Sequence, residues 1–318
     1  MAIAVGGLAY AAYTDVKTRE VPDAVWYVVG GAAVALFALD LDARFGGQAA
    51  IMALPVALLF VVAITGGEIL EVIPGDEPPP EGYELNAAER LRLRIDIALS
   101  AAMVGGALAV FALASRFDLG MPGGLLDGPQ AQAYGVSLMF GLAFLMFFLS
   151  LIAGGADAKG LMTLALLFPV APAFAGLPLV PAPALAVAAV PFALAVFFNG
   201  AVLLVVARLP VSPVVSLRRK AFRFPESFFG VPKKLDRINL DREWVLGAVV
   251  DGAWKRKLMP THGSHSDAKQ KEALEFLKAR GDATAFVSSK LPFMVYLLAG
   301  FFVLVVLSCP LYFVGGWG

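Results

Sequence analysis

Residues 133–152 read AYGVSLMFGLAFLMFFLSLI, a run of twenty residues without a charged side chain. A helix of about 20 such residues is long enough to cross the roughly 30 Å of hydrocarbon in a membrane. Similar runs recur along the chain, and 59% of its 318 residues are hydrophobic, with a mean hydropathy of +0.78. Soluble domains are about 45–50% apolar. The sequence therefore predicts an all-α polytopic membrane protein.

Eight apolar runs are candidate membrane spans, so we expect about eight transmembrane helices. The runs are 2–14, 24–39, 48–66, 95–115, 133–152, 160–177, 183–207 and 291–314. The hydrophilic segment 67–94 is predicted to be an acidic cytoplasmic loop. Segment 209–290 is basic and long enough for a small cytoplasmic domain before the last helix, and a helix is predicted at KQKEALEFLKAR (269–280). The predicted parts of the chain are therefore 1–66, 67–94, 95–208, 209–290 and 291–318.

The balance of charge limits the classes of partner. The chain has 25 Lys and Arg and 25 Asp and Glu, so its formal net charge is zero. This excludes a broadly basic nucleic-acid binder, and we expect membrane lipid, not nucleic acid, as a partner. The only cysteine, Cys309, excludes an intrachain disulfide. His262 and His265 have an H-x-x-H spacing, but the Gly and Ser between them favour a solvated loop over a zinc site. We expect neither a metal nor a cofactor.

The distribution of Lys and Arg predicts the orientation. If the eight spans alternate in direction, 23 of the 25 Lys and Arg lie on one side, and only Arg44 and Arg116 lie on the other. Loops rich in Lys and Arg stay in the cytoplasm. We therefore expect a multi-pass protein of the plasma membrane with its N-terminus outside. Segment 209–290, with 16 Lys and Arg against nine acidic residues, is expected to lie against anionic headgroups.

Two aspartates lie at the ends of apolar runs, in polar turns that resemble one another. Asp15 lies in YTDVKTREVPD (13–23), after the first run, and Asp157 lies in GGADAKG (154–160), between the fifth and sixth. Four crossings separate them, so both are predicted at the cytoplasmic face. Acidic residues at a membrane are costly and therefore candidates for function. Two neighbouring carboxyl groups share a proton and do acid–base chemistry, as in aspartic proteases.

The neighbours of the two aspartates are candidate supporting residues. Gly154, Gly155 and Ala156 place little side-chain bulk before Asp157, which lets a substrate strand approach the carboxylate. Lys17 and Lys159 follow the two aspartates at the same +2 offset. Each lysine either favours ionisation of a neighbouring carboxyl group or extends its amine to the membrane interface.

These motifs resemble those of the archaeal type IV prepilin and preflagellin peptidases, membrane aspartyl proteases with a Gly-x-Gly-Asp signature. Here Ala156 stands at the second glycine of that signature. The segment SSKLPFM (288–294) is similar to the start of the family's final helix, and Asn199 in FFNGAVL resembles an Asn at a comparable position. The resemblance implies that Asp15 and Asp157 are catalytic. It also implies that the substrates are pilin or archaellin precursors, which lose a short class III signal peptide.

Other interpretations of the same residues stay open. An intramembrane protease of the presenilin and signal-peptide-peptidase kind also uses two aspartates, but deeper within its spans, whereas the charged residues around Asp15 favour the interface. A proton-coupled secondary transporter also uses membrane carboxylates. Among nearby residues, Asp23 and Glu20 are predicted to be solvated in a loop. Asn199 either forms a helix–helix hydrogen bond or lies near the active site.

Overall fold

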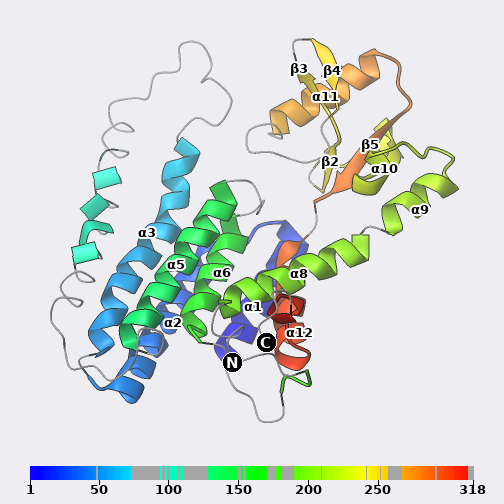
Figure 1. Cartoon of the computed structure of the whole chain (residues 1–318). Helices are drawn as coiled ribbons and strands as arrows, with labels where there is room; N and C mark the ends of the chain where they lie inside the picture. The colour runs from blue at the N-terminus through cyan, green and yellow to red at the C-terminus, as the bar shows by residue number, and fades with distance from the viewer. Residues whose placement is uncertain are drawn as a thin grey trace. The chain divides into compact units, whose positions relative to one another are not determined.

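The structure is a computed structural model, and it is mostly helical (Figure 1). It describes residues 1–47, 49–72, 94, 97–98, 101–102, 104–106, 108–109, 128–148, 152, 155–170, 177–180, 190–208, 210–240, 242–250, 252–256, 267–290 and 292–313. Most of the predicted span 95–115, most of the acidic loop 67–94, and His262 and His265 lie outside the described residues. The described chain forms two compact units. One is helical, and the other covers Val202–Phe293.

The helical unit contains six α-helices, the start of α8 and two 3-10 turns among its described residues. Their bounds are α1 Ala2–Thr18, α2 Asp23–Phe45, η1 Ala49–Met52, α3 Ala53–Val72, α5 Pro129–Phe148, α6 Gly155–Leu167, α8 Phe192–Arg208, α12 Phe293–Val306 and η3 Pro310–Phe313. Helix α6 has a central place, since it contacts α1, α2, α3 and α5. Nine of its thirteen residues are buried.

Two helical segments are long and apolar enough to cross a membrane. They are Asp23–Phe45, which is α2, and Phe192–Arg218, which joins α8 to the short helix α9 (Val211–Arg218). Three further apolar helices are shorter: Ala49–Thr65, Gln132–Phe147 and Phe293–Val306. Within the residues described, length and composition thus support two spans, and the remaining six stay a prediction.

The helix ends differ from the predicted run ends at both aspartates. Helix α1 continues to Thr18, so Asp15 lies in its last turn and not in a loop after residue 14. It stops where Arg19 adopts a left-handed conformation, with φ 63°. Helix α6 begins at Gly155, five residues before the predicted start at residue 160, so Asp157 lies in its first turn. A carboxylate is stabilised there by the positive end of the helix dipole.

Two apolar runs also end earlier than predicted. Helix α6 stops at Leu167 and not at residue 177, because Pro169 disfavours helical geometry in the residue before it. Helix α12 stops at Val306 and not at residue 314. Just after its end, Ser308 takes φ 97° and Pro310 follows. Apolar composition marked these segments correctly, but proline and local backbone geometry decide where the helices end.

Helices α8 and α12 cross in backbone contact. A Cβ atom added to Gly300 would lie 2.5 Å from the backbone nitrogen of Gly200 and 2.6 Å from the carbonyl oxygen of Val196. The buried Asn199 side chain donates to the carbonyl oxygens of Ser308 at 3.2 Å and Gly300 at 3.5 Å. Small residues and amide hydrogen bonds are the usual means of packing membrane helices. Of the two roles considered for Asn199, these contacts support a hydrogen bond between helices.

The second unit combines a small sheet with short helices. Its elements are α9, α10 Glu226–Phe229, β1 Val231–Lys234, η2 Leu235–Arg237, β2 Glu243–Val245, β3 Ala248–Val250, β4 Ala253–Lys255, α11 Asp267–Ala279 and β5 Thr284–Ser289. Strand β5 lies between β1 and β2, antiparallel to both, and β3 pairs with β4 in a hairpin. The predicted helix at 269–280 is confirmed as α11. The expectation of an all-α chain is wrong for this unit.

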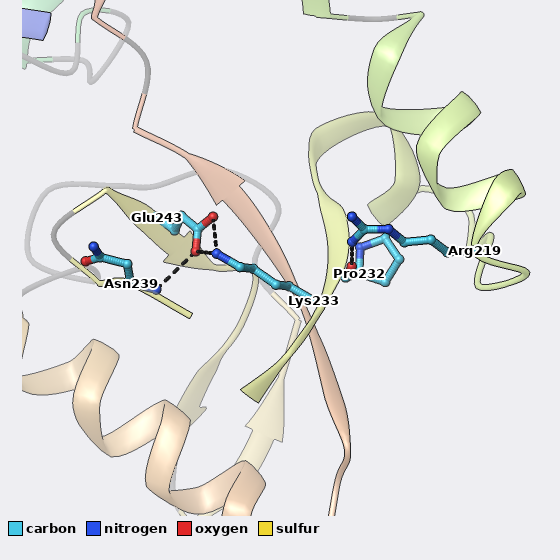
Figure 2. Close-up of polar contacts among 5 residues, drawn as sticks. All are labelled: Arg219, Pro232, Lys233, Asn239 and Glu243. Carbon is cyan, nitrogen blue, oxygen red and sulfur yellow. Dashed lines mark hydrogen bonds and ion pairs between the residues drawn. The ribbon is translucent and has the colours of Figure 1, made fainter. Parts of the chain in front are cut away.

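A compact apolar core and a few polar ties hold this unit together. Leu235, Val245, Leu277, Ala285 and Val287 form the core. Figure 2 shows two sets of polar contacts. In the first, Glu243 accepts hydrogen bonds from the Lys233 amine, at 2.7 and 2.9 Å, and from the backbone N–H of Asn239 at 3.1 Å. In the second, the Arg219 guanidinium donates to the carbonyl oxygen of Pro232. This hydrogen bond from Arg219 holds the end of α9 against β1.

Candidate functional site

Asp15 binds the start of helix α12. Its Oδ2 accepts a hydrogen bond from the backbone N–H of Met294 at 3.1 Å. Met294 is the second residue of α12, and the first N–H groups of a helix have no partner within it. The carboxylate of the first predicted motif therefore meets the segment SSKLPFM, 279 residues away in the chain.

The surroundings of Asp15 change its acidity. Asp15 lies beyond the apolar run 2–14, and burial raises the pKa of its carboxyl group above the usual value of 3.8. The Met294 N–H and the positive charge of Arg19 oppose that rise in pKa. Arg19 has two buried guanidinium nitrogens, Nε and Nη1, that find no hydrogen-bond partner among the described residues. A partly buried carboxyl group with a raised pKa is suited to hold a proton.

Asp157 is buried in the first turn of α6, with 7% of its surface exposed. Gly155 and Ala156 precede it in the same turn and are half-buried. Gly154, the first residue of the predicted motif, lies outside the described residues. The ion pair between Lys159, two residues after Asp157, and Asp23 brings this turn beside the first motif.

Lys159 joins the two motifs through Asp23. Its Nζ lies 2.6 Å from Oδ1 of Asp23, and the two side chains are 13% and 43% exposed. Asp23 is the first residue of α2 and not part of a loop, and it forms this ion pair while its side chain stays partly exposed, as predicted. Lys17 has a different neighbour from Lys159, since its amine lies 5.8 Å from the centre of the Tyr13 ring.

Gly160 allows α6 to pack closely on two other helices. A Cβ atom at this position would lie 3.2 Å from Cη2 of Trp26 in α2, and 3.4 Å from the side chains of Met294 and Leu297 in α12. Met294 is fully buried. It therefore contacts Asp15 through its backbone N–H and packs beside Gly160, three residues after Asp157, through its side chain.

One cleft among the described residues lies away from both aspartates. It has a volume of about 620 Å³ and lies between the C-terminal ends of α2 and α6. Its walls are Leu36, Phe37, Leu39, Asp40, Arg44, Leu166, Leu167, Phe168, Pro169 and Val170. Leu167 follows Asp157 by about 15 Å along the helix axis. We therefore place the candidate active site at the aspartates and not in this cleft.

The structure brings together Asp15, the start of α6 and the start of α12, and it adds Asp23, Trp26 and Met294 to the residues around the site. Asp23 could have been found from its place in the first motif, but its pairing with a lysine 136 residues away leaves no local signal in the sequence. Two carboxyl groups in such a setting can do acid–base chemistry on a peptide bond.

Comparison with known proteins finds no matching family model, no matching curated protein and no matching solved structure.

Proposed function

We propose that this chain is a membrane aspartyl endopeptidase. It uses Asp15 and Asp157 to remove the short class III signal peptide of pilin-like or archaellin-like precursors at the cytoplasmic face of the plasma membrane. The observation that carries this proposal is the convergence at Met294, whose backbone binds Asp15 and whose side chain packs on α6 beside the Asp157 turn. The Lys159–Asp23 ion pair ties the same two motifs together.

The apolar surfaces of the helices support a membrane location. Large side chains of α2 and α8 are exposed, among them Tyr27, Val28, Leu36, Leu39, Val205 and Val206. Water-soluble proteins rarely expose an apolar surface that extends along a whole helix. The proposal includes a multi-pass topology in which the start of α2 lies at the cytoplasmic face.

The two carboxyl groups divide the chemistry. Asp15, with its pKa raised by burial, carries the proton and donates it to the oxygen of the scissile carbonyl. Asp157, in the first turn of α6, is the ionised base and takes a proton from a water molecule. The water oxygen forms a bond to the carbonyl carbon. The C–N bond then breaks as the leaving nitrogen takes the proton from Asp157, and a hydroxyl group of the tetrahedral intermediate returns a proton to Asp15 as the new carboxyl group forms.

Substrate geometry fits a site at a helix boundary. A class III precursor has a basic segment in the cytoplasm followed by an apolar helix. Asp15 ends one helix and Asp157 begins another, so a cleavage point at the interface needs no unwinding in the hydrocarbon layer.

The test is cleavage of a precursor pilin by the purified full chain in detergent. Asp15→Asn and Asp157→Asn should each lower the rate by about 10²–10⁴-fold, as expected for loss of an acid–base group. Asp42→Asn, an exposed residue of α2, is the matched control and should cleave at the rate of the unsubstituted chain. Cleavage that survives either site substitution would refute the pair. A chain that cleaves no precursor but moves protons in vesicles would favour the transporter.

A further inference from the structure

Helix α9 has the reverse of the burial pattern of a soluble helix. Ser212 and Ser216 are 1% and 0% exposed, whereas Val211, Val214 and Leu217 are 54%, 45% and 59% exposed. With about 100° between successive residues, the three apolar side chains share one face and the two serines share the opposite one. The serine face is the one turned toward the protein, where α9 contacts β1 and α10.

Exposed basic and aromatic side chains follow the end of the helix. Arg218 and Lys220 are exposed, as are Phe222 and Phe224. The bond from Arg219 to Pro232 holds this end of α9 on β1 (Figure 2). The exposed apolar face is therefore a fixed feature of the small unit and not an unpacked end.

The place of α9 in the chain indicates what covers this face. It begins three residues after α8 ends, so it directly follows the predicted span 183–207. A helix that follows a membrane span, with apolar side chains on one face and Lys and Arg beside them, is typical of segments that lie in the headgroup layer. A purely apolar partner, such as a second copy of this face, would not account for Arg218 and Lys220.

We propose that the outer face of α9, with residues 218–224, lies in the headgroup layer of an anionic phospholipid bilayer. The valines and Leu217 enter the boundary of the acyl chains, and Arg218 and Lys220 bind lipid phosphate groups. This attaches the Val202–Phe293 unit to the membrane surface through α9. The inference is independent of peptidase activity, because it uses none of the residues of the candidate active site.

The depth of α9 can be measured on the full chain in lipid nanodiscs. A fluorophore is attached to Leu217→Cys, and for comparison to Glu275→Cys on the exposed face of α11. The unsubstituted chain gives the labelling blank, because its only cysteine, Cys309, is buried. Lipids with a quencher near the headgroup should quench the label at residue 217 several-fold more than the label at residue 275. Equal quenching at both sites would overturn the proposal.

The lipid charge and the alternative partner are tested in the same discs. Replacing Arg218 and Lys220 by Gln should weaken the association of α9 with anionic lipid by about fivefold for each charge. The anionic-lipid fraction needed for half-maximal quenching should then rise. The matched change of the exposed Lys271 and Lys278 to Gln should leave it unchanged. Quenching at residue 217 that does not depend on the anionic-lipid fraction would refute binding to anionic lipid. So would a label at residue 217 that is protected when several copies share a disc but exposed when a disc holds one copy, because a second copy would then cover the face.

Discussion

The crossing of α8 and α12 gives the sharpest test of the helical unit, through the substitution Gly300→Ala. The new Cβ would lie 2.5 Å from the backbone nitrogen of Gly200, about 0.9 Å short of the 3.4 Å at which ordinary contact begins. The opposing atoms belong to backbone and cannot rotate away, so the two helices must separate. Overpacking of this kind costs about 1–3 kcal/mol.

Separation of the helices also affects Asn199. Its amide would lose the hydrogen bonds to Gly300 and Ser308, and a buried amide without partners costs a further 1–3 kcal/mol or so. The total expected loss in the free energy of unfolding is therefore about 2–6 kcal/mol. For a unit of this size, that corresponds to a fall of roughly 4–24 °C in Tm.

The single buried thiol provides the assay. Cys309 is fully buried, so a thiol-reactive dye reports unfolding of the chain in detergent as the temperature rises. Gly141→Ala is the matched control, because a Cβ on Gly141 in α5 would meet nothing within 4 Å, and alanine favours helix by up to about 1 kcal/mol. A Gly300→Ala chain that melts within about 1 °C of the unsubstituted chain would refute the reasoning.

Three further predictions concern single contacts. A double-mutant cycle with Lys159→Met and Asp23→Asn should give a coupling of about 1 kcal/mol, limited by the exposure of Asp23, and the coupling should shrink at high salt; no coupling at low salt would contradict the pair. Because burial raises the pKa of Asp15, its stabilising effect is complete below pH 3.8 and is lost as pH rises through the higher pKa of the folded state. As pH rises from 3.8 through the folded-state pKa, the Tm of the unsubstituted chain should therefore fall relative to the Tm of Asp15→Asn. A difference in Tm that stays constant over this pH range would contradict the raised pKa. Gly247→Ala would place a Cβ 2.1 Å from the ring of Trp254, so we expect a loss of about 1–3 kcal/mol and a change in tryptophan emission, and an unchanged spectrum would argue against this packing.

The sequence predicted the helices better than it predicted their ends. Uninterrupted apolar runs identify α2, α5 and α8 because burial and membrane insertion both depend on composition over many residues. The ends depend on single residues. Arg19 turns left-handed at the end of α1, although it is not a residue that normally marks a helix end. Asp15 and Asp157 were therefore found as candidates, but were placed in turns and not in helices.

The strands of the small unit were missed because their pairing is not local. Strands β2, β3 and β4 have three residues each, too few to show an alternating pattern. Val231 of β1 pairs with Val287 of β5, and the intervening residues include another strand pair and a helix. Only the amphipathic helix α11 carries a strong local signal, and it was predicted. The Lys159–Asp23 pair escaped prediction for the same reason, since neither residue indicates the other.

Among the described residues, two boundaries between the units lie beside contacts within the helical unit. One boundary falls between Ala201 and Val202, one residue after Gly200. The other falls between Phe293 and Met294, whose N–H binds Asp15. Gly200 lies against the backbone of Tyr296, so both boundaries lie within a few residues of the crossing of α8 and α12, the contact on which the hydrogen bonds of Asn199 also depend.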